Sequence, residues 1–74
     1  MAKTKTLKVG SKVLVTKVSL SFSDYKNLDG IVKDLHGEFA EVAVPKNKIS
    51  AEDLRDLRKD GDSALIKVKV TNIV

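Results

Sequence analysis

GIVKDLHGEFAEVAV, residues 30–44, is the stretch of sequence that decides the fold. Residues 30–35 and 38–44 are rich in Val, Ile and other residues that favour a pleated, half-buried strand. His36-Gly37 stands between them, and glycine accepts a positive φ at no steric cost. The stretch therefore predicts two strands joined by a tight hairpin turn.

Alternating side chains show which face of each strand is buried, because successive residues of a strand point to opposite sides. In the strand over residues 38–44, the inward set is expected to be Ala40, Val42 and Val44. Residues 64–71 form the clearest strand of the chain, with an inward set of Ile66, Val68 and Val70. Lys67 and Lys69 alternate with that set, so this strand has a basic outer face.

Three further segments complete the pattern. Residues 12–18 predict another strand, and residues 19–27, rich in Ser, predict a long loop. One helix of at most three turns is expected over residues 50–60, where Ser50 is a good N-cap and Gly61 ends the helix.

These segments carry a family likeness: VGSKVLV (residues 9–15), YKNLDGIVKDL (residues 25–35) and EVAV (residues 41–44). Together they resemble a KOW-type SH3-like barrel over residues 7–44, with Gly10 and Gly30 at the characteristic glycine positions. The resemblance implies a strongly bent, five-stranded barrel of a kind found in ribosomal proteins and transcription factors, whose loops touch RNA, DNA or polymerase. The chain departs from the family in the long connection over residues 18–28 and in its helix.

We therefore predict a mainly β fold: a small SH3-like barrel of four to five antiparallel strands with one short helix before the last strand. A fifth strand would lie near residues 5–9 or 72–74. At 74 residues the chain has room for one core. Residues 1–6 are expected to form a basic, flexible N-terminal tail, and residues 7–74 a single domain.

The charge of the chain is unevenly spread. Fourteen Lys and Arg against ten Asp and Glu give a net charge of +4. Residues 1–20 hold five lysines and no acid, whereas residues 50–62 hold five acids and three bases. Without residues 50–62, eleven bases and five acids leave +6, so one part of the molecule should be distinctly basic.

Composition argues against catalysis and metal chemistry. There is no Cys, which excludes disulfides and thiolate zinc sites, and the single histidine, His36, stands in a predicted turn. We expect no enzyme, no cofactor, no metal and no small-molecule substrate. No segment approaches the ~20 apolar residues that span a bilayer, and a secretory signal is not evident, so a cytoplasmic protein with no membrane partner is expected.

The expected partner is nucleic acid, bound through its phosphates. Twelve of the fourteen bases are Lys rather than the Arg that dominates base readout, so little sequence specificity is expected. Three aromatic residues are too few for a single-strand stacking platform. The candidate phosphate-binding residues are Lys3, Lys5, Lys8, Lys12, Lys17, Lys26, Lys67 and Lys69.

Two aromatic residues in the predicted loop, Phe22 and Tyr25, are candidate partner contacts. For Phe22 we favour packing over the end of the barrel, and for Tyr25 we favour contact. We predict a non-enzymatic nucleic-acid-binding domain in transcription, translation or genome handling. The alternative is a protein-interaction module: an accessory subunit, or a small phage-type regulator that docks on a larger host enzyme. Joint exposure of Leu20, Phe22 and Tyr25 would favour that alternative.

Overall fold

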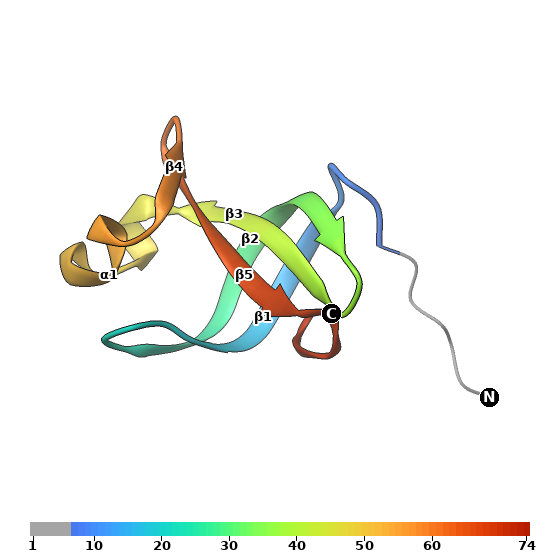
Figure 1. Cartoon of the computed structure of the whole chain (residues 1–74), viewed down its shortest axis with the longest axis horizontal. Helices are drawn as coiled ribbons and strands as arrows, with labels where there is room; N and C mark the ends of the chain where they lie inside the picture. The colour runs from blue at the N-terminus through green and yellow to red at the C-terminus, as the bar shows by residue number, and fades with distance from the viewer. Residues whose placement is uncertain (1–6) are drawn as a thin grey trace.

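The computed structural model describes residues 7–74, so the predicted tail over residues 1–6 lies outside the described residues. Five strands form one antiparallel sheet in the order β1-β2-β3-β5-β4 (Figure 1). The strands are β1 (Lys12–Ser19), β2 (Asp24–His36), β3 (Phe39–Pro45), β4 (Arg58–Asp60) and β5 (Ser63–Lys69). The helical segments are the 3-10 turns η1 (Lys46–Lys48) and η2 (Val70–Asn72) and the short helix α1 (Ala51–Arg55).

The mainly β fold with little helix is confirmed, but the sheet is open because its edge strands β1 and β4 are not paired with each other. The last residues of the chain cover part of the β1 edge. Ile73 forms a single antiparallel bridge with Val15, and Leu14 and Val74 exchange two backbone hydrogen bonds of 3.0 and 2.8 Å. Strand pairing near residues 72–74 is thus limited to this bridge.

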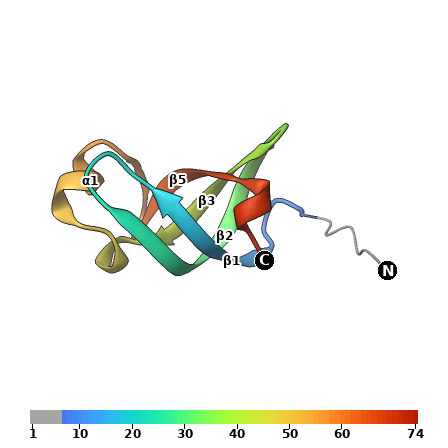
Figure 2. The ribbon, with the colours of Figure 1, turned by 90° about the horizontal axis from the view of Figure 1, so that it is seen from below.

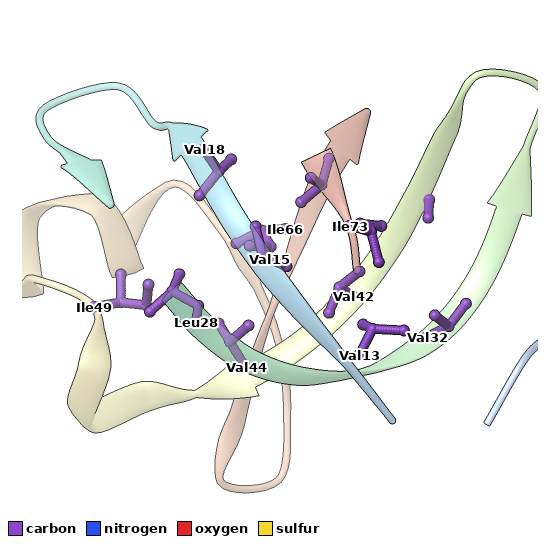
Figure 3. Packing of buried hydrophobic residues seen from close by; sticks show 12 residues of the cluster. Val13, Val15, Val18, Leu28, Val32, Val42, Val44, Ile49, Ile66 and Ile73 are labelled. Atoms are coloured by element: carbon purple, nitrogen blue, oxygen red, sulfur yellow. The ribbon is translucent and has the colours of Figure 1, made fainter. Parts of the chain in front are cut away.

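The sheet bends because β2 pairs with one strand along its first part and with another along its second part. Its residues 24–31 pair with β1 and its residues 31–36 pair with β3. The register with β3 shifts between Val32 and Asp34, and such a bulge increases the local bend of a strand. Figure 3 shows β2 curving around the buried side chains, and Figure 2 shows the same bend from another side.

The core lies inside this bend, and its buried cluster consists of aliphatic side chains (Figure 3). None of the three aromatic residues belongs to the cluster, although Tyr25 packs against it. The predicted inward sets of β3 and β5 are confirmed except at Val70, which belongs to η2 and is half-buried. The buried cluster consists of Val13, Val15, Val18, Leu28, Val32, Ala40, Val42, Val44, Ile49, Ile66, Val68 and Ile73.

Two sequence-based boundaries are wrong. The helix predicted over residues 50–60 ends at Arg55, and Arg58–Asp60 instead form β4, which pairs with β5. Gly61, with φ +63°, turns this β4–β5 hairpin rather than ending a helix. The loop predicted over residues 19–27 shrinks to residues 20–23, because pairing between β1 and β2 extends to their ends. In both places cross-strand pairing overrides local propensity.

Position 30 requires glycine because there is no room for a side chain, and not because the backbone has a positive φ. It lies in β2 with its α-carbon facing the core, and its φ is not positive. A Cβ atom there would press on Val42 Cγ1, lie 2.8 Å from the carbonyl oxygen of Ala43, and lie 3.1 Å from Val44 Cγ1. The bare α-carbon therefore lets β2 approach β3 where the sheet bends.

We predict that Gly30→Val destabilises the domain by about 2–3 kcal/mol or more, because the added side chain overpacks a site closed by backbone and core valines. Thermal denaturation followed by circular dichroism measures the effect. Gly61→Asn is the matched control: it has no neighbour within 4 Å, and Asn tolerates its positive φ. An unchanged midpoint for Gly30→Val would contradict the tight β2–β3 approach.

Candidate nucleic-acid interface

The two aromatic candidates of the β1–β2 hairpin have opposite environments. Phe22 projects outward with 62% of its surface exposed. The prediction that its ring packs over the end of the barrel is therefore wrong. Tyr25 is half-buried and packs against the core, as does Leu20. Phe22 is therefore the only one of the three apolar residues that offers a large free surface.

The Tyr25 hydroxyl belongs to a hydrogen-bond network centred on Asp53, which is buried with 1% exposure. Tyr25 donates to Asp53 Oδ2 at 2.6 Å, and Ser50 Oγ donates to the same oxygen at 3.2 Å. The backbone N–H of Phe22 donates to Asp53 Oδ1 at 2.8 Å. One carboxylate thus fastens the β1–β2 loop to α1.

The same network caps α1. Ser50 is confirmed as the N-cap, because its hydroxyl accepts a hydrogen bond from the Asp53 backbone N–H at 3.3 Å. The Ser50 backbone N–H in turn donates to the Tyr25 hydroxyl at 3.0 Å. Burial raises the pKa of Asp53, but the hydrogen bonds from Tyr25, Phe22 and Ser50 outweigh it and hold this pKa below its usual 3.8.

Lys17 and Lys26 lie directly opposite each other on β1 and β2, and both are exposed. Asn27, with φ 56°, interrupts the alternation of β2, so Tyr25 and Leu28 both pack on the core and Lys26 points outward. Like charges in directly opposed positions destabilise a sheet. The pair therefore carries an electrostatic cost in the free protein.

A second pair of lysines lies on β5. Lys67 and Lys69 are two residues apart and exposed, so they share the outer face of the strand. Phe39 of β3 lies directly opposite Lys69, and the Lys67 ammonium lies 5.9 Å from the centre of its ring. This arrangement combines two cations with an aromatic ring that remains 37% exposed.

A hollow of about 410 Å³ lies beside Lys67, lined by residues of the β1–β2 connection, of α1 and of the segment that follows α1. Lys67 forms part of its wall, and Ser19 lines it from β1, on the side of that strand that also carries Lys17. We call Lys17, Lys26, Lys67 and Lys69 the basic surface. The remaining lining residues are Leu20, Ser21, Asp53, Asp56 and Leu57.

The other candidate lysines lie elsewhere. Lys12 lines a separate hollow of about 430 Å³ together with Asp29, and Lys8 lies before β1. Lys3 and Lys5 fall outside the described residues. Of the six predicted lysines that the structure describes, Lys67 alone lines the 410 Å³ hollow, and Lys17, Lys26 and Lys69 lie on β1, β2 and β5.

The ion pairs of residues 7–74 leave the basic surface free. They join Lys33 to Asp60 at 3.3 Å, Arg58 to Glu41 at 3.8 Å, and His36 to Asp34 at 2.8 Å. Glu41 lies directly opposite Lys67 on β3, and its carboxylate is the one paired with Arg58.

Two important residues escape sequence reasoning. Phe39 alternates with Ala40 in β3, so its outward position follows from the strand pattern, but its proximity to Lys67 depends on the β3–β5 pairing. Asp53 carries the signal of a helix cap, whereas its link to the distant Tyr25 appears only in the fold.

Residues 7–74 contain no group of three or more potential metal-ligating side chains, and no helix there is long and apolar enough to cross a membrane. His36 is exposed at the β2–β3 turn. No family model, curated protein or solved structure matches the chain.

We predict that Lys17→Glu raises Tm by roughly 2–6 °C at low salt, because it converts a like-charge pair into an opposite-charge pair. The gain should shrink as salt screens the charges. The Tm of Lys17→Gln, a change that only removes the repulsion, should lie between the Tm of the wild type and that of Lys17→Glu. A Tm for Lys17→Glu equal to or below that of the wild type would refute the repulsion between Lys17 and Lys26.

We predict that Asp53→Asn lowers Tm at neutral pH, because an amide has one acceptor oxygen where the carboxylate has two. Asp53 titrates with a lowered pKa in the folded state, so its stabilisation is present above 3.8 and disappears as pH falls through the folded pKa. The Tm difference between wild type and variant should therefore shrink from about pH 7 to about pH 2.5. The exposed Asp56→Asn is the control, and a pH-independent difference would count against the ionised network.

Proposed function

We propose that this domain is non-enzymatic and binds nucleic acid by contacting the phosphate backbone through the basic surface, in transcription, translation or genome handling. The observation that carries the proposal is the cross-strand pair Lys17 and Lys26, which faces outward without an ion-pair partner in residues 7–74. A bound phosphate would remove the repulsion between these two ammonium groups.

The chemistry around the hollow supports the same proposal. Lysine ammonium groups and serine hydroxyls both bind phosphate oxygens without reading a base. Lys67 lines the hollow beside Ser19 and Ser21, and Lys69 continues the row along β5. Asp53 and Asp56 line the same hollow, so phosphates would follow the lysines outside it rather than enter it. With Lys rather than Arg on this surface, affinity should depend on phosphate charge and little on sequence.

We also propose that the bent sheet is an SH3-like barrel left open at one seam. The support is the bridge between Ile73 and Val15, which brings the end of the chain to β1 after the 3-10 turn η2. The close approach at Gly30 and the long bent β2 support it as well.

Docking on a larger protein is the second candidate function, and the exposed ring of Phe22 favours it. Against it, Leu20 and Tyr25 pack on the core, so Phe22 stands without an apolar patch around it. Protein interfaces usually bury a cluster of apolar anchors rather than one isolated ring. The nucleic-acid proposal is therefore the better supported of the two.

We expect the wild type to bind duplex DNA weakly, with a log–log salt slope of roughly −3, as three or four phosphate contacts imply. Lys67→Gln with Lys69→Gln should weaken binding and flatten the slope by roughly one to two. The control is Lys46→Gln with Lys48→Gln on η1, which lowers the net charge from +4 to the same +2.

Fluorescence anisotropy titrations at several salt concentrations measure both variants. Equal effects of the two double variants would assign binding to net charge and not to the basic surface. No binding at low salt by the wild type would reject nucleic acid as the partner. Loss of a protein partner in Phe22→Ala would then favour the docking function.

A further inference from the structure

Phe39 is an exposed aromatic ring beside two lysines of β5. It begins β3 at the end of the molecule opposite α1 (Figures 1 and 2). Its cross-strand neighbour is Lys69, and the Lys67 ammonium lies 5.9 Å from the ring centre. The ring is 37% exposed and is not part of the buried cluster.

Such a ring has a specific use on a surface that binds phosphates. An unpaired base can stack on an aromatic side chain, whereas the bases of a duplex are already stacked on each other. The Lys67 ammonium lies over the ring and Lys69 is its cross-strand neighbour, so both could hold the phosphates of a nucleotide whose base stacks there. The local chemistry therefore fits a single strand better than a duplex.

The hollow beside Lys67 extends this path toward the β1–β2 loop. Its wall contains hydroxyls from Ser19 and Ser21, together with the carboxylates of Asp53 and the exposed Asp56. Two carboxylates disfavour a phosphate inside the hollow, but they do not disfavour a neutral base. Phosphates would then follow the lysines on the rim, and a base would turn into the hollow.

We propose that the preferred ligand is a single-stranded polynucleotide, with one base stacked on Phe39 and the adjoining phosphates bound by Lys67 and Lys69. The sequence alone argues against a stacking platform, since the chain has only three aromatic residues. One ring beside two lysines is enough for a single stacked base. This inference rests on the proposed function and narrows its ligand.

Affinity for matched single-stranded DNA, single-stranded RNA and duplex DNA of equal length tests the proposal by anisotropy. The wild type should bind at least one of the two single strands about tenfold more tightly than the duplex. Phe39→Leu should weaken single-strand binding by on the order of tenfold and leave duplex binding and the salt slope unchanged. If one of the two single strands binds more weakly, the other, RNA or DNA, is the preferred ligand.

A spectroscopic variant separates stacking from a merely structural role of the ring. The chain has no Trp, so Phe39→Trp introduces a single reporter whose fluorescence a stacked base should quench. Leu35→Trp is the matched control, because Leu35 has the same 37% exposure on the same hairpin. Leu35 lies opposite the buried Ala40, on the other side of the hairpin from Phe39, and its reporter should not be quenched.

The outcomes distinguish this inference from the function on which it rests. Equal binding of single strands and duplex, with Phe39→Leu neutral and Phe39→Trp unquenched, would overturn the single-strand inference and leave phosphate binding standing. Absence of binding to any of the three nucleic acids would reject both. Quenching of the Trp fluorescence in Phe39→Trp but not in Leu35→Trp, together with weaker single-strand binding by Phe39→Leu, would support both.

Discussion

The close approach of β2 to β3 at Gly30 is the constraint on which the other parts of the sheet depend. β2 pairs with β1 and then with β3, and the change of partner occurs at Ile31, beside that glycine. Without a side chain at Gly30, Val42 and Val44 fill the inner space at the bend. The curvature brings β1 and the end of the chain together, which allows the bridge between Val15 and Ile73.

A second constraint fixes the other end of the molecule. The buried carboxylate of Asp53 accepts hydrogen bonds from a tyrosine hydroxyl, a serine hydroxyl and a backbone N–H of the β1–β2 loop. A five-residue helix has little stability of its own, so α1 depends on this network and on packing. The loop that carries Phe22 is held by the same carboxylate, so its exposed ring projects from an anchored backbone.

The strands were predictable where alternation is strong, and the long-range partnerships were not. Val42 and Val44 follow from period two, and Ser50 from capping chemistry, because both signals are local. The strand character of residues 58–60 depends on pairing with β5, which local propensity does not encode. The lysines were recognisable as a class, but the division between Lys12 and the basic surface required the fold.

The two edges of the open sheet differ in how they are shielded. β4 has only three residues, Arg58–Asp60, all charged and exposed, while the β1 edge is partly covered by the backbone of Ile73 and Val74. Short, charged or covered edges offer a poor template for a strand from another molecule. Crowded copies of the domain would therefore resist edge-to-edge aggregation, although the sheet never closes on itself.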